Sequence, residues 1–239
     1  MIASVHLAEV GRRKALGLLP RSLDPGDVPG LRYARVTTLT ALSEGLLPRP
    51  RLGGIGLMTI WDQEEGLEDF LANHRLARAL ADGWRVRLQP THIFGLIPAV
   101  PELAREELAM ADGEPVAVLT VGRLRLSQTV RFLRASAAAE GQAIRNPALL
   151  AATGMARPPG LVATFSLWGT VGEMRAYAQG QREPQHRAAV KSHGARPFHH
   201  ESAFVRFRPC ASEGQWNGMD PLGNLAPGSL PVEQGLPGV

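Results

Sequence analysis

Apolar and polar residues alternate along several short stretches of the first hundred residues. A period of two is typical of a strand with one buried face. It predicts strands at residues 3–10, 31–39, 55–61 and 84–94. Two other stretches have helical spacing: residues 12–19, which Pro20 ends, and residues 64–81, which begin with acidic residues. The predicted order is β-α-β-β-α-β, which is the ferredoxin-like plan.

The second half predicts the same plan with less regular signals. Its expected strands and helices are strands 116–122, 148–151, 161–168 and 203–207, and helices 127–139, 171–178 and 184–193. Short motifs recur in the same order. Residues 7–12 (LAEVGR) match 118–123 (VLTVGR), residues 56–61 (GLMTIW) match 162–168 (VATFSLW), and His74-Arg75 matches His186-Arg187. The offsets of 111, 107 and 112 residues indicate two repeats.

The repeats define the predicted organisation. We expect an N-terminal ferredoxin-like repeat at residues 1–97, a linker at 98–115, a C-terminal repeat at 116–210 and a Gly/Pro-rich tail at 211–239. In the tail, Trp216, Met219 and Leu222 could anchor the first part. The predicted fold class is α+β, with two tandem ferredoxin-like repeats packed face to face as a dimeric α+β barrel-like domain.

Composition narrows the classes of protein. The chain has 239 residues, of which 44% are hydrophobic and 20% charged, as in ordinary globular proteins. It has no apolar run near 18 residues and no leader pattern at its start, so we expect a cytoplasmic protein without a membrane span. The single cysteine, Cys210, excludes an intrachain disulfide and a multi-cysteine metal site.

The charge does not point to nucleic acid. The net charge is +4, but the arginines are scattered among acids and no DNA- or RNA-binding motif accompanies them. Nucleotide-binding glycine motifs and the serine-hydrolase elbow are also missing. The sequence therefore shows no site for a nucleotide cofactor.

Several motifs resemble one family. Residues 28–31 (VPGL) and 44–50 (EGLLPRP), then 163–168 (ATFSLW), His186, 201–208 (ESAFVRFR) and 214–222 (GQWNGMDPL), are similar to those of the spheroidene monooxygenases. The resemblance implies a dimeric α+β barrel-like fold and oxygenation that depends on haem b. Such oxygenation would use O₂ with electrons from a ferredoxin or reductase, or peroxide. The resemblance also implies that a histidine on a helix of one repeat holds the iron, and His186 is the matching position.

The residues around His186 agree with an axial ligand. Pro184 could open its helix, and imidazole is the usual haem ligand where no thiolate serves. Cys210 lies beside Pro209, after the last strand, which is a poor place for a ligand. The alternative is a surface helical histidine. His74, near Arg75 and Arg78, is expected on a solvated face.

The remaining candidates are assigned by type. His193, His199 and His200 are expected to be exposed loop histidines, because a zinc site needs three or four converging ligands. Phe165 and Phe204, with Leu167, could form an apolar wall for the cofactor. Guanidinium and ammonium groups could pair with haem propionates. The candidates for this role are Arg187 and Lys191, and also Arg123, Arg196 and Arg206, of which Arg123 and Arg206 are the catalytic candidates.

The predicted function is a haem-dependent monooxygenase acting on a hydrophobic or secondary-metabolite small molecule. One alternative keeps the haem but changes the reaction to peroxidation, dehydration or nitrogen oxidation. The other is a haem-free barrel protein that binds a small molecule. A monomer and a homodimer are both compatible with fused repeats.

Overall fold

The alternating stretches form the strands of one closed barrel. The structure is a computed structural model that describes residues 1–21, 23–43, 45, 49–105, 108–180 and 198–223. The first half contains β1 (Ile2–Glu9), α1 (Arg12–Leu18), β2 (Leu31–Ala41), β3 (Arg49–Trp61), α2 (Glu64–Asn73), α3 (Arg75–Ala79) and β4 (Trp84–Gly95). The second half contains β5 (Val116–Leu124), α4 (Thr129–Ile144), β6 (Leu149–Arg157), β7 (Leu161–Trp168), α5 (Val171–Gly180) and β8 (His199–Glu213). Short 3-10 turns lie at Pro101–Arg105 and Leu126–Gln128.

The strand order is the same in the two halves. The barrel runs β1-β3-β2-β6-β7-β5-β8-β4, so the halves contribute β4-β1-β3-β2 and β8-β5-β7-β6. With the element order β-α-β-β-α-β, this is the ferredoxin-like plan. The predicted mixed α/β, ferredoxin-like fold is therefore confirmed, in the form of a closed eight-stranded barrel.

The two junctions between the halves differ in length. Strands β4 and β8 pair from Arg85 opposite Glu213 to Gly95 opposite Ala203. Strands β2 and β6 pair only over Thr38–Thr40 and Gly154–Ala156. The short junction leaves the first part of β2 without a partner from β6.

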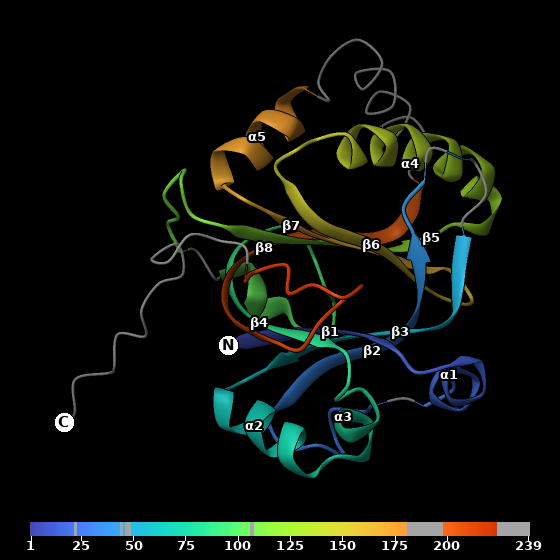
Figure 1. Cartoon of the computed structure of the whole chain (residues 1–239), viewed down its shortest axis with the longest axis vertical. Helices are drawn as coiled ribbons and strands as arrows, with labels where there is room; N and C mark the ends of the chain where they lie inside the picture. The colour runs from blue at the N-terminus through green and yellow to red at the C-terminus, as the bar shows by residue number, and fades with distance from the viewer. Residues whose placement is uncertain (22, 44, 46–48, 106–107, 181–197, 224–239) are drawn as a thin grey trace.

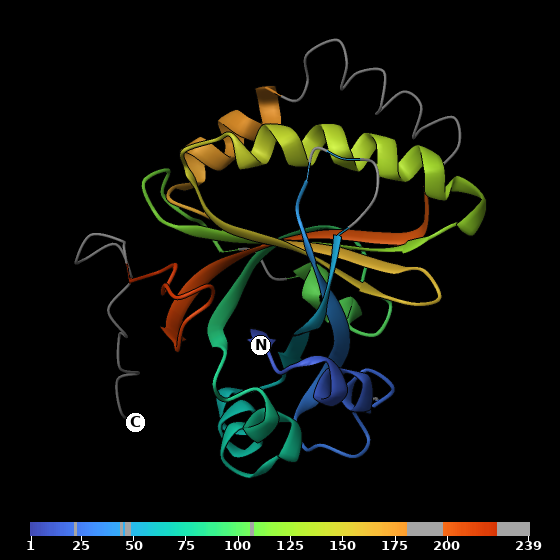
Figure 2. The same cartoon turned by 45° about the vertical axis from the view of Figure 1, so that its right-hand side comes forward.

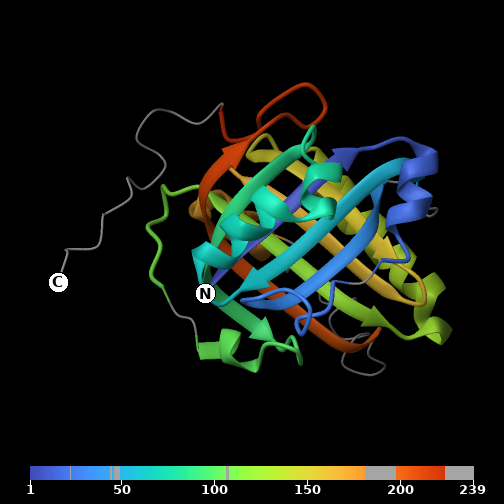
Figure 3. The ribbon, with the colours of Figure 1, turned by 90° about the horizontal axis from the view of Figure 1, so that it is seen from below.

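Helices cover two opposite outer sides of the barrel. Helices α1, α2 and α3 lie against the strands of the first half, and α4 and α5 lie against those of the second (Figures 1 and 2). Seen from the side of α2, the strands cross behind the helices at a steep slant (Figure 3). Inward side chains such as Leu7, Val86 and Phe165 fill the barrel interior. The core therefore has an inner cluster and one outer cluster under each helical layer.

The helix predicted over residues 64–81 is broken at His74. This residue takes an extended backbone conformation, with φ −82° and ψ 135°, between α2 and α3. Its Nδ1 accepts a hydrogen bond from the Leu76 N–H at 3.1 Å, and its ring stacks on Phe70 at 4.8 Å between centroids. A side-chain acceptor at this position starts a new helix. The continuous helix predicted over residues 64–81 was wrong, whereas Arg75 and Arg78 beside the half-buried His74 are exposed, as expected of a solvated face.

Three strands are much longer than predicted, among them β3, which begins at Arg49 and not at residue 55. Strand β6 extends well beyond residues 148–151, and β8 extends on both sides of 203–207. Alanine and glycine have low strand propensity, and their number in β6 weakened the sequence pattern that predicts this strand. His199 and His200 belong to β8, so placing them in a loop was wrong.

The first repeated motif matched the right strands in the wrong register. Ile2 lies opposite Trp61, and Val116 lies opposite Trp168, so β1 and β5 correspond with a different offset. Leu7 points into the barrel, whereas Val118 packs outside it. A shift by an odd number of residues exchanges the two faces of a strand.

The first part of the tail packs on the barrel through two of its three predicted anchors, whereas the third, Met219, is exposed. Trp216 and Leu222 join the inner cluster, and Trp216 forms a bridge with Met219. The Asp220 carboxylate accepts hydrogen bonds from Trp84 Nε1 at 3.0 Å and from Ser212 Oγ at 2.9 Å. Across the described part of the chain, none of the helices has the length and apolar character needed to span a membrane.

A buried histidine in β1 should make stability depend on pH. Burial lowers the pKa of His6 from 6.5 to about 3, with a smaller contribution from Arg85. The unfolded chain therefore takes up a proton below pH 6.5 that the folded chain takes up only near pH 3. We expect the free energy of unfolding to fall by about 1.4 kcal/mol per pH unit in this window. Urea unfolding of the wild type and His6→Gln at several pH values measures this slope; equal slopes would contradict it.

Candidate functional site

The outer faces of the two half-sheets carry side chains of different size. His6 lies opposite Leu57 in the ladder of β1 and β3, and Thr120 lies opposite Thr164 in the ladder of β5 and β7. His6 of the first half therefore corresponds to Thr120 of the second, and Leu57 corresponds to Thr164. On the neighbouring strand, Val36 corresponds to Gly154, since they lie opposite Leu57 and Thr164. The second half has the smaller residue at each of these positions.

Large side chains fill the space under the helices of the first half. Leu57 and Phe70 are buried, and the Phe70 ring contacts Trp61 at 5.3 Å and His6 at 6.4 Å between centroids. Leu57, Trp61 and Phe70 belong to one continuous outer cluster. The first half is packed as a core.

The second half has a cavity in the corresponding place. A space of about 550 Å³ lies between the outer face of β5, β6 and β7 and the helices α4 and α5. We call it the helix–sheet cavity. Its wall is mainly apolar, and among the residues that line it are Val118, Thr120, Gly122, Phe132, Ala137, Glu140, Gly154, Ala156, Thr164, Ser166, Trp168, Met174, Tyr177, His199 and Phe204.

Two polar groups of this wall are already paired. Trp168 Nε1 donates a hydrogen bond to Ser166 Oγ at 3.0 Å, as Trp61 Nε1 does to Thr59 Oγ1 at 2.7 Å in the first half. The Tyr177 hydroxyl donates to the Ala139 carbonyl at 2.9 Å. These bonds fix the aromatic rings at the edge of the cavity.

One imidazole reaches the cavity from β8. A Cβ on Gly122 would lie 2.6 Å from His199 Cδ2, so only a glycine leaves room for this ring. The ring meets Phe132 of α4 edge-on, at 5.2 Å between centroids. Gly122 and Phe132 thus hold His199 against the cavity wall.

One carboxyl group also lines the cavity. Glu140 Oε2 accepts a hydrogen bond from the Ser43 N–H at 3.0 Å. Burial raises the pKa of Glu140, and the bond from Ser43 opposes this in part. A carboxyl that holds its proton more firmly beside an apolar cavity can deliver that proton during a reaction.

The structure separates the two phenylalanines predicted to form one wall. Phe204 lines the helix–sheet cavity from β8. Phe165 is fully buried inside the barrel, where its ring lies 6.1 Å from that of Trp84. The two rings lie on opposite faces of the sheet, because Phe165 belongs to the inner cluster.

The predicted arginines also lie apart. The Arg206 guanidinium lies on the outside of β8, 5.8 Å from the Phe94 ring centroid, and does not line the cavity. Burial lowers the pKa of Arg206, with a contribution from Arg175. Arg123 lies at the rim of the barrel. The other candidates lie outside the described residues: His186, Arg187, Lys191, His193 and Arg196.

Sequence reasoning missed the residues that create the cavity. Thr120 and Thr164 occupy outward positions of strands that were predicted correctly, and Gly154 lies on the strand that was underestimated. Small residues at alternate positions were the available signal. Among the described residues, no group of three or more His, Cys, Asp or Glu side chains could hold a metal ion.

Comparisons with known proteins were made by sequence and by structure. The spheroidene monooxygenase of Rubrivivax gelatinosus is 32% identical over 195 residues, which are 80% of this chain and 73% of the relative. That of Rhodobacter capsulatus is 26% identical over 202 residues, 82% of this chain and 83% of the relative. That of Cereibacter sphaeroides is 26% identical over 185 residues, 75% of this chain and 56% of the relative.

No family model matches the chain. A solved anthrone oxidase-like protein is 12% identical with a TM-score of 0.34, covering 91% of this chain and 94% of its own. The fold is therefore described from the strand order of this chain and not from this likeness. The identity and coverage of the sequence relatives are sufficient to assign the family. The chain belongs to the spheroidene monooxygenase family.

Proposed function

We propose that this protein is a haem-dependent monooxygenase that holds its haem and an apolar substrate in the helix–sheet cavity. The observation that supports it is the cavity of about 550 Å³ under α4 and α5, where the first half is filled by large side chains. Its volume lies within the roughly 300 to 1,000 Å³ of small-molecule and cofactor sites. Membership of the family supports the reaction class.

The cavity residues fit a flat apolar group. The wall of small side chains leaves room for a macrocycle, and Gly122 leaves room for the His199 imidazole beside it. The described lining residues include no lysine or arginine, so propionate groups would need partners elsewhere. We propose His186 as the iron ligand and Arg187 and Lys191 as propionate partners. Bound haem would supply the activation of oxygen.

The residues of the chain have three tasks in this proposal. The alanine-rich wall binds the apolar substrate and excludes water, and the hydroxyls of Thr120 and Thr164 orient it. Glu140 holds a proton at its carboxyl and delivers it. One oxygen atom of O₂ enters a C–H bond of the substrate and the other leaves as water, which consumes two electrons from a ferredoxin or reductase and two protons.

The same proposal treats the two halves as tandem repeats. The equal strand orders and the shared bond from tryptophan to the hydroxyl two residues earlier support it. The first repeat is then structural, since its corresponding space is a packed core. Only the second repeat carries the chemistry.

Turnover with isotope-labelled O₂ tests this function. Haem-loaded protein would be incubated with spheroidene, a ferredoxin and its reductase, and the product analysed by mass spectrometry. We expect one labelled oxygen atom per product, and a loss of turnover of roughly hundredfold in Glu140→Gln. The control is Glu65→Gln, at an exposed position of α2. Absence of label would refute monooxygenation. Equal rates in the two variants would remove Glu140 from the mechanism.

A further inference from the structure

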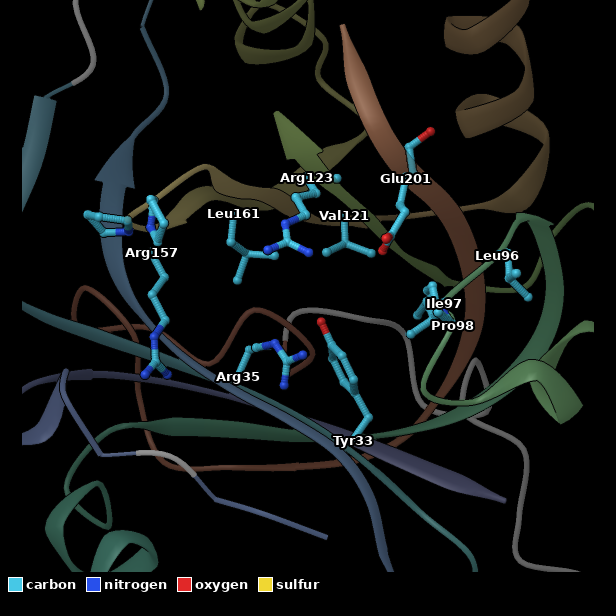
Figure 4. Close-up of a pocket in the computed structure, with 14 residues that line it drawn as sticks. Tyr33, Arg35, Leu96, Ile97, Pro98, Val121, Arg123, Arg157, Leu161 and Glu201 are labelled. Atoms are coloured by element: carbon cyan, nitrogen blue, oxygen red, sulfur yellow. The ribbon is translucent and has the colours of Figure 1, made fainter. Parts of the chain in front are cut away.

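A second cavity opens at one rim of the barrel. It measures about 340 Å³ and lies where β2, β7 and β8 begin and where β4, β5 and β6 end. We call it the rim cavity (Figure 4). Its lining residues are Tyr33, Arg35, Leu96, Ile97, Pro98, Val121, Gly122, Arg123, Arg157, Pro158, Pro159, Leu161, Glu201 and Ser202.

The short junction between the halves lies beside this cavity. Strands β2 and β6 pair at Thr38 and Ala156, and no ladder pair joins them nearer the rim. Arg35 on β2 and Arg157 at the end of β6 come from the two sides of this unpaired stretch. The junction therefore brings two guanidinium groups, one from each half, to the same opening.

Three guanidinium groups line the cavity without a carboxylate partner. Among the ion pairs between described residues, none involves Arg35, Arg123 or Arg157. Arg35 Nη1 donates to the Ala34 carbonyl at 2.7 Å and Arg157 Nη1 to the Val36 carbonyl at 3.5 Å. Each guanidinium has five N–H donors, so most donors remain for a ligand.

Tyr33 and Glu201 add two further polar groups to the lining. The Arg35 guanidinium lies 4.6 Å from the centroid of the buried Tyr33 ring. Burial raises the pKa of Tyr33, so its hydroxyl stays protonated and can donate a hydrogen bond. Figure 4 shows the Tyr33 hydroxyl, the Arg123 guanidinium and the Glu201 carboxylate directed toward one space. Three positive charges against one negative charge leave the cavity cationic.

Apolar side chains lie among these polar groups: Leu161 is the ladder partner of Arg123, and Val121 lies two residues before it (Figure 4). Val121 and Leu161 belong to or pack against the inner cluster, and Ile97 is buried beside them. The rim cavity therefore combines cationic groups with an apolar lining. Its charged groups lie at the inner face of the barrel, whereas the helix–sheet cavity lies mainly on the outer face of β5, and the two cavities share Val121 and Gly122.

We propose that the rim cavity binds a small organic carboxylate with an apolar body. The planar fork of an arginine binds a carboxylate through two parallel hydrogen bonds, and Arg35 and Arg123 present such forks from the two halves of the barrel. The Tyr33 hydroxyl donates a further bond. The apolar body lies against Val121, Leu161 and Ile97. This site differs from the cavity proposed for oxygenation, so its test does not depend on haem.

Calorimetric titration of the purified full chain with benzoate tests this site. We expect saturable binding, weakened about tenfold or more in Arg35→Met and in Arg123→Met, because each removes charge-assisted hydrogen bonds. Arg35→Lys should recover part of the affinity by restoring the charge. Arg12→Met, at an exposed position of α1, is the matched control and should bind as the wild type does. Circular dichroism verifies that each variant is folded.

A neutral probe and a purely ionic probe separate the contributions of the charged groups from those of the apolar groups. Benzyl alcohol, which lacks the carboxylate, and inorganic phosphate, which lacks the apolar body, should both bind more weakly than benzoate. The proposal is overturned if benzoate does not bind, if either probe binds as tightly as benzoate, or if Arg12→Met weakens binding as much as Arg35→Met.

Discussion

His186→Ala is expected to lose most of its haem, or to show shifted Soret and visible bands, and to lose oxygenation. The substitution removes the proposed protein–iron bond while the walls of the helix–sheet cavity stay in place. The axial ligand is one of the main determinants of haem reactivity, so turnover should disappear even where some haem remains. Absorbance spectra and turnover of the purified variant measure both effects. Added imidazole should restore part of the spectrum by occupying the vacated position.

His74→Ala is the matched control. His74 caps α3 and stacks on Phe70, so its loss should lower stability by about 1 kcal/mol and leave haem content unchanged. Comparing the two variants separates ligation from a general loss of folding. The assignment of His186 fails if its variant keeps wild-type spectra and turnover while His74→Ala is impaired.

Thr164→Leu is expected to close the helix–sheet cavity. It gives the second half the residue that fills the corresponding position of the first, Leu57. Stability should rise by about 1 kcal/mol, as is common when a cavity is filled. Haem and substrate should bind about tenfold or more weakly, because overpacking costs roughly 1 to 3 kcal/mol. Thermal unfolding and haemin titration measure the two effects.

Leu57→Thr makes the reverse exchange in the first half. Leu57 is fully buried, so the variant should lose roughly 3 kcal/mol of stability. Its haem affinity should stay at the wild-type value, because the first half holds a packed core. Equal haem affinity in Thr164→Leu and the wild type would remove the helix–sheet cavity as the binding site.

The alternation of residues predicted most strands because burial of one face requires it. The ranges around Leu7, Leu57 and Leu167 were identified in this way. Strand β6 gave a weak signal because alanine and glycine, as at Ala152 and Gly154, favour strands little. The break at His74 was missed because neither glycine nor proline marks it.

The site was less predictable than the fold. The cavity arises because the outer face of the second half-sheet carries smaller side chains than that of the first. This difference can be recognised only once the ladder registers show that Leu57 and Thr164 occupy corresponding positions. The positions of Glu140 and His199 at the cavity wall depend on contacts with Ser43 and Gly122, which are distant in sequence. The arginines of the rim cavity come from three strands and carry no local motif.

Haemin titration of the purified full chain, followed by its Soret absorbance, tests the central claim most directly. The account predicts saturation at about one haem per chain, because only the second half has the helix–sheet cavity while the first half is filled. A folded protein that stays colourless and binds no added haemin would contradict it.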